Sequence, residues 1–248
     1  MNEALTAETI TITGHGGAEI EAYAGRPLGA DQFGSVVIIH HMPGYDSATK
    51  EIARKFAAFG YAAVMPNLHH RDAPGASSDD AAAANRANGG VPDEQLVGDV
   101  SSAADYLRAQ DGSNGKVGVI GYCSGGRQAF LAACRLPQLN AAVDCYGAAV
   151  VNAPPEGFPV KFTPVVGLAE DLACPLLGLF GADDKFPAPD ETAELSRILD
   201  GLGKEHDFHT YEGAGHAFFS VNRPSYRVEA ASDGWDKIWD FYGRYLAS

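Results

Sequence analysis

The segment from Gly121 to Gly126 places a cysteine on a turn where catalytic chemistry is expected. Its sequence is Gly-Tyr-Cys-Ser-Gly-Gly, and it lies between the apolar run 117–120 and a predicted helix. A strand–turn–helix of the form G-x-S-x-G is a nucleophile elbow. The residues two before and two after the nucleophile must be small because the backbone of this turn is strained. Gly121 and Gly125 meet that condition for Cys123.

Ser124 is the competing nucleophile, but Tyr122 lies two residues before it and is too large for that place. We therefore predict Cys123 as the nucleophile. The first turn of the following helix offers free N–H groups and the positive end of the helix dipole, which favour a reactive thiolate. The amide of Ser124 can also point at an oxyanion formed on a substrate. A glycine-rich turn with an incidental buried cysteine is the alternative.

A cysteine nucleophile needs a base, and the base needs a group that orients it. Asp183 and Asp184 follow the apolar run 175–180, and His216 follows the strand expected at 206–211. Nucleophile, acid and histidine is the chain order that such an elbow requires. A single aspartate more often caps a helix, and a single loop histidine is more often solvated. Three candidates in the required order, each after a predicted strand, favour a catalytic triad.

The paired histidines His40–His41 and His69–His70 raise the question of a metal site. Adjacent histidines in an extended loop point apart, and no further ligand has matching spacing. We therefore expect no metal and no cofactor. The four cysteines show no C-x-x-C spacing, so we expect free thiols in a reducing cytoplasm.

The composition of the 248-residue chain is typical of a globular protein, with 46% hydrophobic and 20% charged residues. Its net charge of -14 repels nucleic acid and anionic membranes, so we expect neither as a partner. No apolar run is long enough to span a membrane, and no secretory signal is visible at the start. We expect a monomer, because no exposed apolar stripe is evident, and we expect it in the cytoplasm because of the free thiols.

Hydrophobic periodicity predicts an α/β fold. Residues 8–13 and 18–25 alternate polar and apolar side chains around a glycine-rich link, which indicates an antiparallel hairpin. Continuous apolar runs indicate buried strands at 35–39, 61–65, 117–120, 141–145 and 175–180. Helices are expected near 48–59, from 93, after 123, near 190–202 and near 228–246. Repeated strand–helix units predict a mostly parallel central sheet with helices on both faces.

Two segments fall outside this alternation. Residues 67–92 are polar and predict a long loop or short helices. Residues 149–172 carry several prolines and aromatic residues and predict a surface excursion that could shape a pocket. No linker or repeat is visible, so we predict a single domain, 1–248.

These features together resemble the dienelactone hydrolase (carboxymethylenebutenolidase) family of α/β-hydrolases. The main matching segments are the elbow 121–126, Phe-Gly-Ala-Asp-Asp at 180–184, and Tyr-x-Gly-Ala-x-His-Ala-Phe at 211–218. Further matches are the segments 37–44, 60–68 and 114–118, with Pro187, Arg223, Tyr226, Ala230, Ala231 and Trp235. The resemblance covers nearly the whole chain. Its most specific element is the cysteine of the elbow, since most related hydrolases carry serine there.

The resemblance implies that a Cys-His-Asp triad hydrolyses an enol-lactone ester without a cofactor. Carried over, Cys123 is the nucleophile and His216 the base and later the acid. For the acid, Asp184 fits the usual Gly-x-x-Asp spacing, whereas counting back from Pro187 favours Asp183; we choose Asp184. The backbone N–H of Met42, beside that of Ser124, is implied as the second oxyanion donor.

The chain departs from the family pattern at two places that bear on the substrate. Members often carry a glutamate in the first oxyanion loop, where this chain has His41. Of two arginines that hold the substrate carboxylate, Arg71 matches one, and Ser220 stands where the other is expected. We expect Arg71, His41 and Tyr122 to contact a small ester or lactone with an anionic or polar group. A surface salt bridge of Arg71, for example with Asp72, is the alternative.

Hydrolysis of a small ester or lactone is the function that we predict. The same triad could instead transfer an acyl group or attack a halogenated acid, because fold and elbow do not choose among these reactions. A non-catalytic scaffold is a third hypothesis, either binding a small ligand or sensing oxidants through Cys123.

Overall fold

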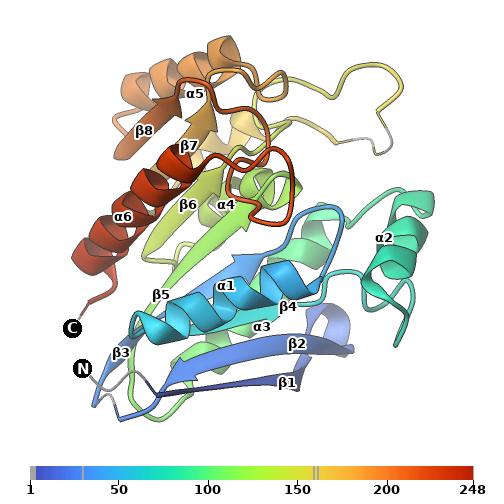
Figure 1. The fold of residues 1–248 in the computed structure, drawn as a ribbon, viewed down its shortest axis with the longest axis vertical. Coiled ribbons are helices and arrows are strands. Elements are labelled where there is room, and N and C mark those ends of the chain that lie inside the picture. The colour runs from blue at the N-terminus through green and yellow to red at the C-terminus, as the bar shows by residue number, and fades with distance from the viewer. Residues whose placement is uncertain (1–3, 30, 159, 161, 248) are drawn as a thin grey trace.

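The computed structural model describes residues 4–29, 31–158, 160 and 162–247. Its centre is an eight-stranded sheet in the order β1-β2-β4-β3-β5-β6-β7-β8 (Figure 1). The strands are β1 (Leu5–Thr13), β2 (Glu19–Pro27), β3 (Phe33–Ile39), β4 (Ala62–Pro66), β5 (Ser113–Tyr122), β6 (Ala141–Cys145), β7 (Leu176–Gly181) and β8 (His206–Tyr211). The pairs β1–β2 and β2–β4 are antiparallel and the others are parallel. The predicted α/β fold with its N-terminal hairpin is confirmed.

Helices cover both faces of the sheet. The core on one face includes residues of α1 (Ser47–Ala58) and α6 (Val228–Tyr245), which lie in front of the sheet in Figure 1. The core on the other face includes residues of α3 (Asp93–Arg108), α4 (Ser124–Arg135) and α5 (Pro189–Gly201). Within the described ranges, no helix is both long and apolar enough to cross a lipid bilayer.

The continuous apolar runs form strands because both faces of the sheet are covered. All seven residues of β3 are buried, as expected where helices pack on each side of a parallel strand. Between α1 and α6 the packing is aromatic. The ring of Trp239 lies 5.2 Å from that of Phe56 and stacks on Phe59 at 4.0 Å, measured between ring centroids.

The two segments outside the alternation, 67–92 and 149–172, take different forms. The stretch 67–92 contains α2 (Ser78–Ala87). The excursion 149–172, of which Pro159 and Lys161 lie outside the described residues, is held by the buried Arg127 of α4. The Arg127 guanidinium donates to both carboxylate oxygens of Asp93, at 2.8 and 2.9 Å, and to the carbonyl oxygen of Thr163 at 2.7 Å.

Candidate active site

The turn between β5 and α4 holds Cys123 in a strained conformation. Its φ of 58° lies in the left-handed region, which costs free energy in a residue with a side chain. The turn is tight because a Cβ atom on Gly121 would overlap the carbonyl oxygen of Gly125, and one on Gly125 would overlap that of Ile39. The N–H of Cys123 donates to the carbonyl oxygen of Cys145 at 3.0 Å. The steric requirement expected from the sequence is therefore present.

The groups predicted to assist Cys123 follow the carboxyl ends of β7 and β8. The His216 Nδ1 lies 2.8 Å from a carboxylate oxygen of Asp184, and the Cys123 side chain is near enough to the imidazole to influence its pKa. Asp184 is buried and its other oxygen accepts from the N–H of Phe186 at 3.0 Å, whereas Asp183 is exposed. Of the two candidate aspartates, Asp184 is thus the one that contacts the histidine.

The surroundings of His216 favour its charged form. Burial alone lowers the pKa of the imidazole, but the hydrogen bond to Asp184, the interaction with the Cys123 side chain and the charge of Asp184 outweigh burial and raise it to about 10. His216 is then an imidazolium at neutral pH. Its side chain remains 35% exposed, so the thiol–imidazole pair is accessible from outside.

Cys123 differs from the other three cysteines in its exposure. Cys134, Cys145 and Cys174 are buried, whereas Cys123 is partly exposed. Burial raises the pKa of the Cys134 and Cys174 thiols to about 12, and it also raises that of Cys145. These three thiols are therefore poor nucleophiles.

Tyr146 belongs to the site, although we did not predict it from the sequence. It follows the last residue of β6, has a φ of 44°, and places its ring edge-on to the His216 ring at 5.2 Å. The signal in the sequence was its position directly after a buried strand, at the sheet edge where ligands bind in α/β folds.

The loop after β3 is held by His40. The Nδ1 of its imidazole lies 2.9 Å from the carbonyl oxygen of His41, and its Nε2 accepts from the N–H of Leu68 at 3.2 Å. Both bonds require a neutral ring with its proton on Nδ1, and burial, the main cause, lowers the pKa of His40 to about 3. Because a trans peptide directs its C=O and N–H in opposite directions, His40 also fixes the direction of the Met42 N–H.

Met42, in the loop after β3, and Ser124, after β5, line the same small cavity. This cavity measures about 20 Å³, which is enough for one water molecule. Ser124 is the first residue of α4, where backbone N–H groups have no partner within the helix.

His41 is paired with a carboxylate that we did not predict. Its Nε2 lies 3.1 Å from an oxygen of Asp46, the residue that caps α1. Burial raises the pKa of Asp46, but hydrogen bonds from His41 and Thr49 outweigh burial and lower it well below its ordinary value. The glutamate that family members often carry at position 41 is absent, but Asp46 brings a carboxylate to the same loop five residues later. The Asp-x-x-Thr spacing of the helix cap was its signal in the sequence.

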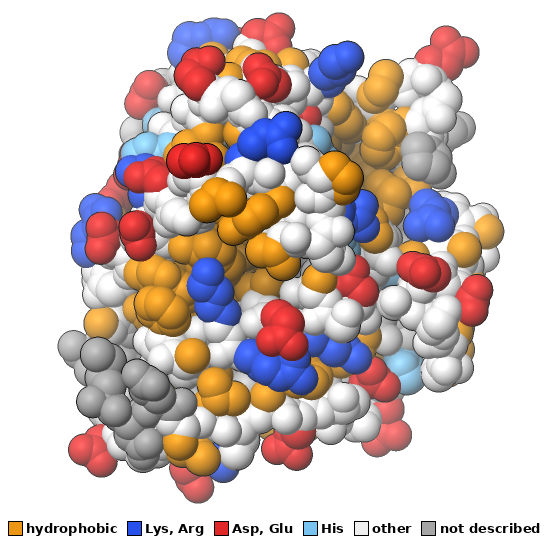
Figure 2. Space-filling model, in the orientation of Figure 1, with side chains coloured by type: hydrophobic (Ala, Val, Ile, Leu, Met, Phe, Trp, Pro, Cys, Tyr) orange, Lys and Arg blue, Asp and Glu red, His pale blue; other side chains and the backbone are white. Residues whose placement is uncertain are grey.

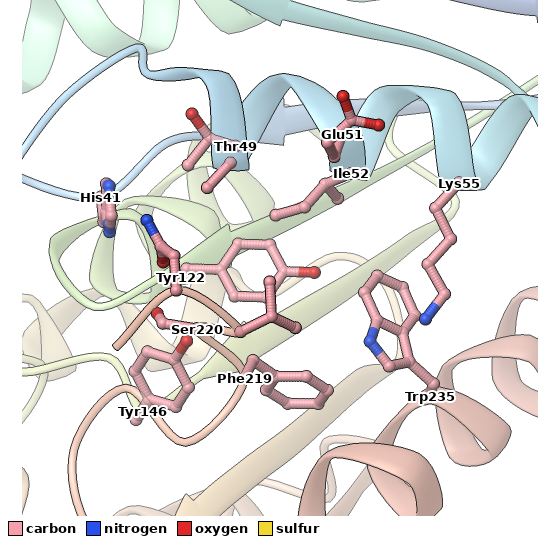
Figure 3. A pocket seen from close by; sticks show the side chains of 13 residues that line it. His41, Thr49, Glu51, Ile52, Lys55, Tyr122, Tyr146, Phe219, Ser220 and Trp235 are labelled. Atoms are coloured by element: carbon pink, nitrogen blue, oxygen red, sulfur yellow. The ribbon is translucent and has the colours of Figure 1, made fainter. Parts of the chain in front are cut away.

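A larger cavity opens beside these groups (Figure 3). It measures about 130 Å³. Among the predicted contacts, His41 and Tyr122 line it, and the buried hydroxyl of Tyr122 has no hydrogen-bond partner in the described part of the chain. The full lining is His41, Ala48, Thr49, Glu51, Ile52, Lys55, Tyr122, Tyr146, Phe219, Ser220, Val221, Asn222 and Trp235.

Arg71 lies elsewhere. Its guanidinium donates to both oxygens of the buried Asp99, at 2.8 and 2.9 Å, and to the carbonyl oxygen of His15 at 3.1 Å. It lines neither of the two cavities described above. This position does not support a contact with the substrate, and the salt-bridge partner is Asp99 rather than Asp72. Within the described ranges, no group of three or more His, Cys, Asp or Glu side chains is arranged to hold a metal ion.

The fold and the position of the elbow define an α/β-hydrolase. The profile of the Dienelactone hydrolase family matches residues 20–246, and the chain belongs to this family. The family resemblance expected from the sequence is confirmed, and the protein is a carboxylic ester hydrolase.

Named relatives agree with this assignment. A carboxymethylenebutenolidase of Pseudomonas putida is 31% identical over 245 residues, which cover 96% of each chain. A Yersinia pestis protein, provisionally named carboxymethylenebutenolidase, is 32% identical over 240 residues, or 94% of this chain and 86% of the relative. A crystal structure from Klebsiella pneumoniae, provisionally named dienelactone hydrolase, has a TM-score of 0.85 and 29% identity, with 98% of this chain and all of the other covered.

Proposed function

We propose that this hydrolase cleaves a small ester or lactone through a triad of Cys123, His216 and Asp184, with a thioester intermediate. The observation that carries the proposal is the imidazole of His216, which is hydrogen bonded to the buried Asp184 and lies near enough to Cys123 for that side chain to influence its pKa. A nucleophile, a base and a group that orients the base are the parts that such catalysis needs.

The first half-reaction acylates the cysteine. The Cys123 thiolate attacks the ester carbonyl, and the N–H groups of Ser124 and Met42 stabilise the resulting oxyanion. Each such donor contributes about 3 kcal/mol in comparable sites. The intermediate collapses to a thioester as the C–O bond breaks, and the His216 imidazolium gives its proton to the departing alkoxide.

The second half-reaction releases the acid. A water molecule attacks the thioester and gives a proton to His216, which is now neutral. Collapse of this intermediate expels the Cys123 thiolate beside the imidazolium, so that the starting pair is restored. The carboxylic acid product then loses its proton to solvent. Asp184 holds the imidazole in place through both steps.

A cysteine replacement tests the proposal. In Cys123→Ala we expect hydrolysis of p-nitrophenyl acetate to fall by about 1000-fold or more, and no acyl-enzyme to appear by mass spectrometry after rapid quenching. Cys174→Ala is the matched control, because Cys174 is a buried thiol outside both cavities, and it should keep both signals. Turnover in Cys123→Ala near that of the unchanged protein would refute the proposal. An added alcohol or thiol acceptor separates acyl transfer from hydrolysis.

A further inference from the structure

The larger cavity has the size and walls of a site for one planar ring. An engineered apolar cavity of about 150 Å³ holds benzene, and this one measures about 130 Å³. Ile52, Phe219 and Trp235 contribute apolar walls, and the ring of Tyr122 lies between them (Figure 3). Flat aromatic walls pack well against a flat ligand.

The two ends of the cavity differ. Figure 3 shows His41 at one end and Lys55 with Trp235 at the other, with Tyr122 and Phe219 between them. The end with His41 is the catalytic one, because His41 precedes Met42 in the loop after β3. A ligand with its ester near Cys123 would therefore direct the far side of its ring toward Lys55.

Lys55 is a cation without an anionic partner. Its Nζ lies 3.8 Å from the ring centroid of Trp235, and no carboxylate within the described ranges is in ion-pair distance. Burial lowers the pKa of the ammonium, opposed by the charge of Asp236. A partly buried ammonium that makes no ion pair favours a bound anion.

The neighbouring charges leave Lys55 available. Glu51 lies one helical turn earlier, but its carboxylate is bonded to Arg54 and points away from the Lys55 ammonium in Figure 3. Among the described lining residues, Lys55 is the one lysine or arginine. On this face of the molecule, Figure 2 shows a lysine or arginine side chain among hydrophobic ones between α1 and α6.

We propose that the preferred substrates are aromatic esters that carry an anionic group on the side of the ring remote from the ester, and that Lys55 binds this group. The inference rests on the proposed function, because it places the ester at Cys123. It makes Lys55 a specificity-determining residue and predicts a flat aromatic substrate longer than a compact lactone.

Two esters of the same shape test this charge preference. The anion 4-acetoxybenzoate and the neutral 4-acetoxybenzamide differ in charge at the remote position. We expect the unchanged protein to have the higher kcat/KM for the anion, although its net charge of -14 repels anions in general. In Lys55→Met the kcat/KM for the anion should fall by about tenfold, the range of a charge-assisted hydrogen bond, while the value for the amide should change by less than about twofold. Lys55→Arg should retain the preference.

Lys50→Met is the matched control. Lys50 lies on the same helix with its Nζ 4.0 Å from the Tyr45 ring centroid, and it does not line the cavity. The Lys50→Met substitution removes the same charge as Lys55→Met. An equal loss of kcat/KM for the anion in Lys50→Met would therefore overturn the inference, as would an unchanged preference for the anion over the amide in Lys55→Met. Binding of 4-hydroxybenzoate, measured by titration calorimetry, separates this inference from the proposed function. If no ester is hydrolysed but Lys55→Met binds 4-hydroxybenzoate more weakly than the unchanged protein, only the proposed function fails. If 4-hydroxybenzoate binds equally to Lys55→Met and to the unchanged protein, the proposed anion site at Lys55 is refuted.

Discussion

Replacing Arg71 by methionine separates a structural role of this guanidinium from a role in binding substrate. Asp99 lies in α3 with no solvent exposure, and it accepts two bonds from Arg71 and one from the N–H of His15 at 2.7 Å. Without Arg71 the buried carboxylate keeps a single hydrogen bond. Breaking a buried ion pair on one side costs about 3–5 kcal/mol.

The expected loss is at the lower end of that range. The Arg71 side chain is 23% exposed, so water can reach part of the space that it leaves. A loss of about 3 kcal/mol corresponds to a fall in Tm of roughly 6–12 °C for a chain of this size. Urea unfolding gives the free energy, and thermal unfolding gives the Tm. The kcat/KM for 4-acetoxybenzoate should stay within about twofold in the folded variant.

A double variant checks the physical reason. In Arg71→Met with Asp99→Asn, the buried charge is removed together with its partner, so most of the lost stability should return. A variant Arg71→Met with unchanged stability and a KM for 4-acetoxybenzoate raised tenfold or more would refute this reasoning. Arg71 would then be a substrate contact, as the family resemblance implies.

Two further predictions concern groups around the thiol. His40→Phe should lower kcat by up to about 100-fold with little change in KM, because the Met42 N–H loses its fixed direction. Steady-state kinetics with p-nitrophenyl acetate measure kcat and KM, and an unchanged kcat would contradict the role given to His40. His216 has a folded pKa of about 10, above its unfolded value, so its contribution to stability is complete below about pH 6.5 and is lost as the pH rises to 10. Urea unfolding at pH 6 and pH 10 gives the free energies of unfolding of the unchanged protein and of Asp184→Asn, and their difference should therefore shrink with rising pH. A difference that stays constant would show that Asp184 does not stabilise the protein through the charge of the His216 imidazolium.

The sequence was sufficient to predict the fold because its signals are local. A run such as 35–39 is apolar throughout since helices cover both faces of the strand that it forms. The order of Cys123, Asp184 and His216 after separate strands was also visible, since parallel strands direct their carboxyl ends to one edge. Spacing from Gly181 and counting back from Pro187 pointed to different aspartates, and the structure shows that Asp184, the one chosen from the Gly181 spacing, contacts the histidine.

The contacts between distant helices could not be predicted in this way. Arg71 finds its partner in Asp99 on a helix that the sequence does not place beside it. Lys55 and Trp235 meet because α1 and α6 pack on the same face, although they lie near opposite ends of the chain. On the sequence alone each is an ordinary member of an amphipathic helix. Such pairs depend on tertiary packing and have no local signature.

The imidazole of the site depends on the least protected strand of the sheet. β8 is the outermost strand beside β7, and none of its residues is fully buried. Strands in such positions open locally at a lower free-energy cost than the whole sheet. Fraying of β8 would carry His216 away from Cys123 while β5 and β6 remain paired. The thiol would therefore become unreactive before the protein unfolds, and its reactivity reports on the integrity of that edge.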